Sequence, residues 1–279
     1  MLDNTEPSLN IDKDIQEGVE TREGQRIKVY SPLRLAKKVL LGTMLGDAAI
    51  DKNQVTKTKA RFIMQHSVNQ LPYVIWKMQL LQPVLGMYGV NLYRVGAGNN
   101  KMYGTIRVRS QLCRFGKYIY DDFYFERNGK VQKEVHINIL RRLTAESLAV
   151  WYTDDGSLEC TNISKVPSMV SLAVCSFSEQ EQELIKNYMF DVWGVDASWK
   201  ESMNGKTEKR YKSLRMCGNN MRRFIDIVEP HICPWMKYKV DPSHKRETLS
   251  YDESDEIVRS LRQRGELIGL NPIVNSNEF

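Results

Sequence analysis

Two stretches of the sequence place carboxylates where a helix is expected to end. Asp154 and Asp155 close an apolar run that begins at Leu148, and Asp47 closes another that begins at Leu40. Because the C-terminal end of a helix carries partial negative charge, carboxylates there are disfavoured unless a positive charge lies beside them. Mg²⁺ is a suitable cation, since it prefers carboxylate and carbonyl oxygens. The predicted metal ligands are Asp47, Gly46, Asp155 and Asp154.

These carboxylates are suited to the hydrolysis of a phosphate ester. Metal ions held between Asp47 and Asp155 would lower the pKa of bound water and would hold the attacking and the leaving oxygen. An aspartate beside a glycine is also common in ordinary turns, so either stretch alone favours a turn. The presence of both stretches in one chain favours the metal-binding interpretation.

The helices that carry the carboxylates have recognisable ends. Thr144 is a suitable N-cap for the second helix, and Gly156 follows its last turn. Ser31 and Pro32 supply a capping hydroxyl and a first-turn proline to the first helix, whose apolar residues recur at helical spacing. Both carboxylate stretches are therefore expected at the ends of amphipathic helices.

The order of the elements that we predict is the same in the two halves of the chain. Asp47 and Asp155 are 108 residues apart, and so are Arg107 and Arg215. A repeat of this length, present twice, indicates a duplicated half-domain, so we expect an α+β protein with an approximate twofold axis. The predicted strands are 59–67, 91–96, 102–110, 168–177, 199–200 and 211–217, and the other predicted helices are 71–88, 112–123, 178–192 and 219–228.

Composition divides the chain into four predicted parts. Residues 1–30 are polar and acidic and are expected to form a flexible arm. The half-domains are predicted to span 31–143 and 144–240. In the extension 241–279, Ser254 is expected to cap a helix that runs to about Arg264.

The remaining composition excludes several classes of protein. The five cysteines are scattered and the four histidines have no ligand spacing, so neither a disulfide framework nor a zinc site is expected. No apolar run approaches the length of a membrane span, and no signal peptide is evident at the N-terminus. We expect a protein that is not secreted and that works inside the cell beside its target, in the cytoplasm or an organelle matrix.

Charge indicates a nucleic-acid partner. The first twenty residues hold six acidic side chains against one basic one, a net of −5. Because the whole chain carries +6, the remainder carries +11. A strongly basic folded body is typical of proteins that bind nucleic acid, although lysine-rich solvated surfaces are also common.

The paired motifs resemble those of the LAGLIDADG homing endonucleases, in particular the single-chain branch with two motifs. The nine-residue motif falls on Leu40–Ala48 and on Leu148–Gly156, and the resemblance covers roughly residues 31–240. It implies two αββαββα half-domains whose motif helices lie side by side and whose antiparallel sheets form a saddle on the major groove. It further implies a monomer that makes a staggered double-strand break with 3′ overhangs, using Mg²⁺, for which Mn²⁺ is expected to substitute.

The same resemblance implies two catalytic lysines beside Asp47 and Asp155. Lys133, in the basic loop before the second motif, fits the first, with Lys130 as a competitor, and Lys239 in Pro234–Lys239 fits the second. A lysine near a scissile phosphate can orient water or stabilise developing charge.

Base and phosphate contacts are predicted along the paired strands, because a β-ribbon fits the major groove. Since the halves have diverged, the DNA target should be asymmetric. Alternatives on the same scaffold are a group I intron maturase that binds intron RNA and a DNA-binding regulator that does not cleave. The predicted DNA-binding residues are Arg61, Gln65, Arg94, Asn99, Lys101, Arg107, Arg109, Lys200, Lys206, Lys209, Arg210, Lys212 and Arg215.

Overall fold

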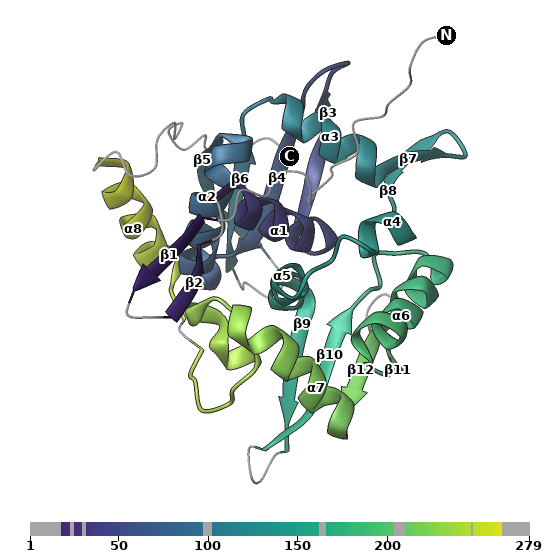
Figure 1. Ribbon diagram of the computed structural model, residues 1–279. Coiled ribbons are helices and arrows are strands. Elements are labelled where there is room, and N and C mark those ends of the chain that lie inside the picture. The colour runs from purple at the N-terminus through teal and green to yellow at the C-terminus, as the bar shows by residue number, and fades with distance from the viewer. Residues whose placement is uncertain are drawn as a thin grey trace.

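Two four-stranded antiparallel sheets carry helices on one face (Figure 1). The computed structural model describes residues 18–22, 25–29, 32–96, 102–161, 166–203, 210–246 and 248–263. The first half contains α1 (Pro32–Leu45), β3 (Ala48–Val55), β4 (Ala60–Ser67), a 3₁₀ turn η1 (Val68–Gln70), α2 (Leu71–Leu85), β5 (Met87–Gly96), β6 (Met102–Ser110) and α3 (Arg114–Phe123). The second half contains α5 (Ala145–Asp155), β9 (Gly156–Cys160), β10 (Pro167–Ala173), α6 (Glu179–Trp193), β11 (Ser198–Met203), β12 (Arg210–Cys217) and α7 (Gly218–Val228).

Both sheets have the same topology. Their strand orders are β3-β4-β6-β5 and β9-β10-β12-β11, so each strand occupies the place of its counterpart in the other half. Each half thus has the order αββαββα, and the α+β fold of two related half-domains is confirmed. Between them lie the hairpin β7 (Tyr124–Arg127) and β8 (Lys130–Lys133) and the short α4 (Ile137–Leu140).

Several elements differ from the sequence prediction. Strands β3 and β9 begin directly after the motif aspartates. The sequence does not predict them, because they contain few apolar residues at alternating positions. The segment predicted as a basic loop is the β7–β8 hairpin, and residues 18–22 and 25–29 pair as strands β1 (Gly18–Arg22) and β2 (Gln25–Val29). The predicted cap Ser31 lies outside the described residues.

The C-terminal helix also begins earlier than predicted. Helix α8 (Tyr251–Gln263) starts after Ser250, which forms a capping box with Glu253, and Ser254 is buried inside the helix. The Ser254 hydroxyl donates to the carbonyl of Val68 in the first half, and Val258 is fully buried. The extension therefore docks on the first half of the protein.

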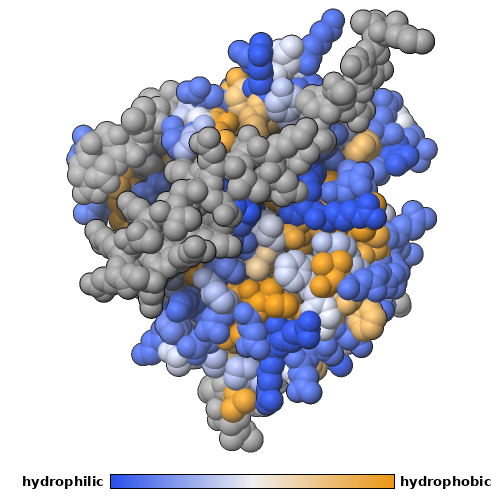
Figure 2. Space-filling view, in the orientation of Figure 1, coloured by the Kyte–Doolittle hydropathy of each residue, from blue (hydrophilic) through white to orange (hydrophobic). Residues whose placement is uncertain are grey.

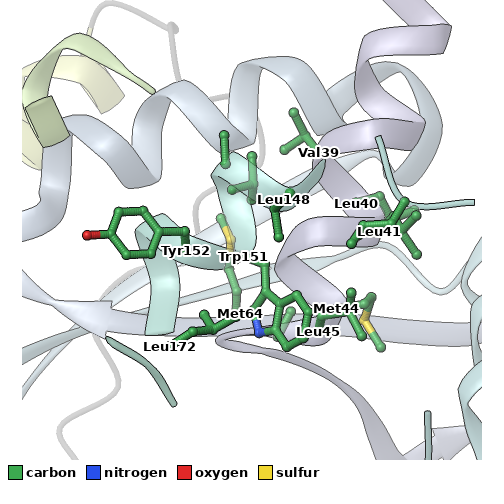
Figure 3. Packing of buried hydrophobic residues seen from close by; sticks show 14 of the residues in the cluster. Val39, Leu40, Leu41, Met44, Leu45, Met64, Leu148, Trp151, Tyr152 and Leu172 are labelled. Carbon is green, nitrogen blue, oxygen red and sulfur yellow. The ribbon is translucent and has the colours of Figure 1, made fainter. Parts of the chain in front are cut away.

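The two motif helices α1 and α5 pack directly against each other, and Figure 3 shows side chains of both in one hydrophobic cluster. Close approach depends on glycine: a Cβ added to Gly42 would lie 2.2 Å from the carbonyl oxygen of Ser147. Lys38, midway along α1, and Glu146, in the first turn of α5, form an ion pair of 2.6 Å across the same contact. We call this α1–α5 contact the seam.

Gly42→Ala is expected to destabilise the protein by forcing the seam apart. The added methyl group cannot be accommodated by a flexible side chain, because a backbone carbonyl faces it. Overpacking of this kind costs about 1–3 kcal/mol, which thermal unfolding would detect. The control is Gly129→Ala in the β7–β8 turn, where φ is +73° and an added Cβ meets nothing within 4 Å, so it measures backbone strain alone. Equal melting temperatures for the two variants would contradict the tight seam.

Hydrophilic side chains cover much of the face seen in Figure 2, with smaller hydrophobic areas between them. Among the described residues, no helix has the length and apolar character that crossing a membrane requires.

Candidate active site and nucleic-acid interface

The two motif aspartates lie where the helices of the seam end. Asp47 follows α1 and Asp155 is the last residue of α5. The pKa of Asp47 is raised to about 7, first by burial and then by repulsion from Asp154 and Asp155. The pKa of Asp155 is raised to about 6 by burial and then by Asp154. The two carboxylates thus share one partly buried, negatively charged site, and the oxygens of Asp47 remain partly open, with 34% of its side chain exposed.

Each helix end receives one lysine. The ammonium of Lys133 donates to the carbonyls of Met44 (2.8 Å) and Ala48 (3.1 Å), at the end of α1. Lys239, in the 3₁₀ turn η3 (Pro234–Lys239), donates to the carbonyls of Thr153 and Gly156 (2.9 Å), at the end of α5. These carbonyls carry the negative end of each helix, so the lysines supply part of the positive charge that the sequence assigned to a metal ion alone.

The lysine contacts also distinguish Lys133 from Lys130. Lys130 begins β8, next to the hairpin turn, and is exposed, whereas Lys133 lies at the far end of that strand against α1. Burial lowers the pKa of Lys133, against the opposing charges of Asp155 and Asp47. Burial likewise lowers the pKa of Lys239 to about 8. Both ammonium groups thus lie close enough to the carboxylates to respond to their charge.

The Asp154 carboxylate does not face the open site. Its oxygens accept hydrogen bonds from Lys77 (2.9 and 3.1 Å), Thr43 (2.9 Å) and Tyr73 (2.8 Å), and its side chain is fully buried. Burial acts to raise the pKa of Asp154, but Lys77 outweighs it and holds that pKa below its ordinary value. The metal-binding role of Asp154 stays a prediction: its oxygens lie in one group with those of Asp47 and His66 that could hold a metal ion, but Lys77 already neutralises its charge. Gly46 can offer a metal only its carbonyl.

His66 is a site residue that sequence reasoning missed. Its Nδ1 lies 3.3 Å from Asp47 Oδ2 and 3.3 Å from the amide oxygen of Gln70. Burial and then the charge of Lys77 lower the pKa of His66 to about 3, so its imidazole is neutral. Nitrogen and carboxylate oxygens of His66, Asp47 and Asp154 lie within 4.8 Å of one another. Because Asp154 is already paired, Asp47 is the member of this trio most available to an external cation.

The sequence contains a signal that distinguishes Lys77. It is the one charged residue in Leu71–Leu85, a helix that is otherwise apolar or uncharged. A lysine inside such a stretch is rarely buried without a partner. The sequence alone could not identify that partner, because Asp154 is 77 residues away.

The first sheet turns one face away from the core. Ile63 pairs with Arg109 and Gln65 with Arg107, which places Gln65 and both arginines on one face with Arg61. The guanidinium of Arg107 donates to the amide oxygen of Gln65 at 2.9 and 3.1 Å. Within the described residues, the Nε atoms of Arg61 and Arg109 have no hydrogen-bond partner. We call Arg61, Gln65, Arg107 and Arg109 the first basic face.

Arg94 is not part of the first basic face. Its neighbour Tyr93 lies on that face, with Arg107 5.5 Å from its ring centre, and successive residues of a strand point to opposite sides. Arg94 instead pairs with Asp252 of α8 at 2.6 Å and lies over the ring of Tyr251. The pleat thus directs Arg94 toward α8, and its contact with DNA stays a prediction.

The second sheet is arranged in the same way. Arg215 is exposed, and it pairs with Ser171 of β10 on the face opposite the buried Leu214. Lys212 has the parity of Leu214 and contacts Glu179 of α6 at 3.2 Å, so its side chain lies on the side of the sheet opposite Arg215, and its contact with DNA stays a prediction. Lys200 is on the Arg215 side and forms an ion pair with Glu159 of β9. We call Arg215 and Lys200 the second basic face.

Five predicted contact residues cannot be placed. Asn99, Lys101, Lys206 and Lys209 lie outside the described residues, and the side chain of Arg210 also lies outside them.

Comparison with known proteins identifies a family whose profile covers both motifs. Residues 37–224 match the profile of the LAGLIDADG DNA endonuclease family. The chain is 25% identical over 228 residues to "Protein RecA" of Mycolicibacterium flavescens, covering 78% of this chain and 50% of that protein. It is 24% identical over 217 residues to DNA endonuclease I-ChuI of Chlamydomonas applanata, covering 75% of this chain and 95% of that one. The chain thus spans about half the length of the RecA protein it matches.

The same fold occurs in a solved structure, the homing endonuclease I-WcaI bound to its DNA recognition sequence. The TM-score is 0.62 at 20% sequence identity, covering 77% of this chain and 88% of that one. Because the family profile spans more than half of the sequence and includes both motif aspartates, this chain belongs to the LAGLIDADG DNA endonuclease family.

Proposed function

We propose that this protein is a monomeric, site-specific homing endonuclease that makes a staggered double-strand break with 3′ overhangs in a long, asymmetric DNA target. The proposed half-domains are residues 31–143 and 144–240. One observation carries the proposal: Asp47 and Asp155 share a charged site at the seam, each with a lysine at its helix end. The first strand of each sheet, β3 or β9, begins directly after one of these aspartates.

The residues of the site fit Mg²⁺, with Mn²⁺ as a substitute. Asp47 and Asp155 are the proposed ligands, because hard carboxylate oxygens suit these ions and their mutual repulsion is relieved by a cation. When bound, the metal ion would lower the pKa of water and would neutralise charge on the leaving oxygen. Lys133 uses two N–H groups on carbonyls, so a third is left to contact a phosphate oxygen or to orient water.

The two basic faces would recognise the DNA. Arginine can donate two hydrogen bonds to guanine, and a glutamine amide can donate one to adenine N7 and accept one from adenine N6, so Arg107 and Gln65 are suited to reading base edges. Arg215 matches Arg107 in the repeat, but Cys217 stands where the first half has Arg109, and Ser171 pairs with Arg215 where Gln65 pairs with Arg107, which favours an asymmetric target. The pair of Lys200 and Glu159 would have to open or turn for Lys200 to reach a phosphate.

Cleavage of a DNA library tests this function. Candidate insertion-site DNA is incubated with the full chain in Mg²⁺ and in EDTA, and the ends of the products are sequenced. We expect Mg²⁺-dependent breaks at one long site, offset to leave 3′ overhangs. Site-specific binding without cleavage would instead support a DNA-binding regulator, and blunt ends would contradict the two-site arrangement.

DNA affinity is expected to depend on Arg107 and Arg215 but not on Arg94 and Lys212. Each loss of a base-reading arginine should weaken binding by about tenfold to a hundredfold, equivalent to about 1–3 kcal/mol. Arg94→Ala and Lys212→Ala are matched controls, because they remove the same charge from the opposite side of the sheets. Binding is measured in Ca²⁺ at several salt concentrations, and affinity should fall steeply with salt. Equal losses for all four variants would contradict the assignment of the faces.

The stabilising effect of Mg²⁺ is expected to strengthen with pH. In the metal-free protein the raised pKa values, about 7 for Asp47 and about 6 for Asp155, mean that protons compete with the cation. Below these pKa values, the Mg²⁺ concentration that gives half of the stabilisation should fall by about tenfold for each unit that the pH rises and for each proton displaced.

The same raised pKa values predict that the metal-free protein becomes less stable as the pH rises. Because the folded state holds these two protons more tightly than the unfolded chain does, stability falls as pH rises through the folded pKa values. Thermal unfolding with Mg²⁺ titration at several pH values measures both effects. The double variant Asp47→Asn with Asp155→Asn should lose both. A Mg²⁺ midpoint that is independent of pH would contradict metal binding by these carboxylates.

A further inference from the structure

Lys77 is an unusual residue because its side chain is fully buried in α2. Its ammonium contacts both oxygens of Asp154, at 2.9 and 3.1 Å, and the hydroxyl of Thr43 at 2.8 Å. The Asp154 side chain is equally buried. Removing both charges from water costs a considerable free energy, which offsets much of their mutual attraction. The role of this pair is therefore sought in the position at which it holds the Asp154 side chain.

The pair has no counterpart in the other half of the protein. Lys77 belongs to the first half, and Asp154 belongs to the motif helix of the second half. In the 108-residue repeat, Asp154 corresponds to Gly46 and Lys77 corresponds to Ile185, which is buried and apolar. The duplicated site is therefore symmetric in Asp47 and Asp155 but asymmetric in the residues behind them.

Asp154 lies directly against the turn that carries Asp47. A Cβ added to Gly46 would lie 2.5 Å from the Asp154 Cβ, so the two backbones are in close contact there. The backbone N–H of Asp47 points to Asp154 Oδ2 at 3.4 Å. Gly46 has no side chain with which to hold Asp155 in the same way. Asp154 thus supports the turn that carries Asp47, whereas Gly46 gives Asp155 no such support.

The ring of Tyr73 extends this support. Its hydroxyl donates to Asp154 Oδ1 at 2.8 Å, and its ring meets that of His66 edge-on at 5.6 Å. His66 in turn contacts Asp47. Asp47 is therefore held from two sides, through its amide by Asp154 and through its carboxylate by His66. Both contacts depend on the buried cluster centred on Lys77.

We propose that Lys77 and Asp154 are positioning residues for Asp47 alone, so that cleavage of one DNA strand depends on this pair and cleavage of the other does not. The inference rests on the proposed endonuclease function. Without the ammonium, the buried Asp154 carboxylate repels Asp47 and leaves its place against the turn. A displacement of about 1 Å can cost about a hundredfold in rate, so the strand served by Asp47 should slow selectively.

Strand-resolved kinetics test the proposal. The two strands of the target carry different end labels, and single-turnover rates are measured for each in Mg²⁺. Lys133→Met, at the Asp47 end, and Lys239→Met, at the Asp155 end, first identify the strand served by each end. The test variants are Lys77→Met and the double variant Lys77→Met with Asp154→Asn, which leaves no unpaired charge. The control is Lys38→Met, which breaks the ion pair with Glu146 across the seam, between α1 and α5.

We expect both test variants to slow the strand that Lys133→Met identifies by about tenfold to a hundredfold, with the other strand changed less than about threefold. Lys38→Met should leave the ratio of the two rates unchanged. Equal slowing of both strands, slowing of the other strand alone, or no change would overturn the positioning role. Failure of the wild type to cleave either strand would overturn the proposed function as well, so the two failures are distinguishable.

Discussion

Asp47→Asn and Asp155→Asn are each expected to abolish double-strand cleavage while DNA binding in Ca²⁺ is retained. Replacing one carboxylate oxygen by an amide keeps the shape of the side chain but removes the negative charge that holds a cation. Losing several kcal/mol of transition-state stabilisation would slow the reaction by at least about a thousandfold. The rate is measured as conversion of supercoiled plasmid to linear product.

Asp51→Asn is the matched control for this experiment. Asp51 is half-buried on β3, four residues beyond Asp47, and its carboxylate accepts a hydrogen bond from the N–H of Asn53. The Asp51→Asn variant should cleave DNA at the wild-type rate. If Asp47→Asn or Asp155→Asn retained that rate, the catalytic assignment would be wrong.

Lys77→Met is expected to produce the largest loss of stability of any single substitution discussed for this protein. It leaves the Asp154 carboxylate buried without its cation, and breaking a buried pair from one side costs about 3–5 kcal/mol. For a chain of this size, that loss lowers the melting temperature by about 10 °C. Thermal and denaturant unfolding at neutral pH measure it.

The pH dependence of that loss identifies its cause. In the wild type, the lowered pKa of Asp154 contributes stability above its ordinary range, and this contribution disappears as pH falls through the folded value. In Lys77→Met the carboxylate should instead take up a proton readily, so the variant should recover relative to the wild type at acidic pH. The double variant with Asp154→Asn should regain much of the stability at neutral pH. A deficit that is the same at every pH would point to lost packing instead.

Lys38→Met provides the comparison within the same seam. Its partner Glu146 keeps 16% of its side chain exposed, so water can solvate the carboxylate that remains. The expected loss is smaller than that of Lys77→Met, about 1–3 kcal/mol, because the carboxylate that remains is partly solvated. A loss as large as that of Lys77→Met would mean that any break in the seam is equally costly.

Local signals in the sequence determined most of the architecture. The predicted helix 178–192 is observed as α6, which a capping box of Ser178 and Glu181 opens, and Met102–Ser110 forms a strand with the predicted ends. The 108-residue spacing predicted two halves with one topology, which the strand orders confirm. These features depend on contacts between residues that are near in sequence or on a repeated pattern, so one sequence suffices to detect them.

Tertiary structure decided which side some charged residues face. Lys212 and Arg215 lie three residues apart in one predicted strand, so alternation alone separates them, but Arg94 was separable from Arg107 of the neighbouring strand only once the register of the two strands was known. The partners of Asp154 come from residues 77, 81 and 111 positions away, and no local pattern reports such contacts. The sequence by itself therefore determined where the two motif carboxylates are and that they occur as a pair. The packing of α2 against the seam decided that one side of this pair is held by a buried ion pair, because burial, unlike helical period, is a property of the whole fold.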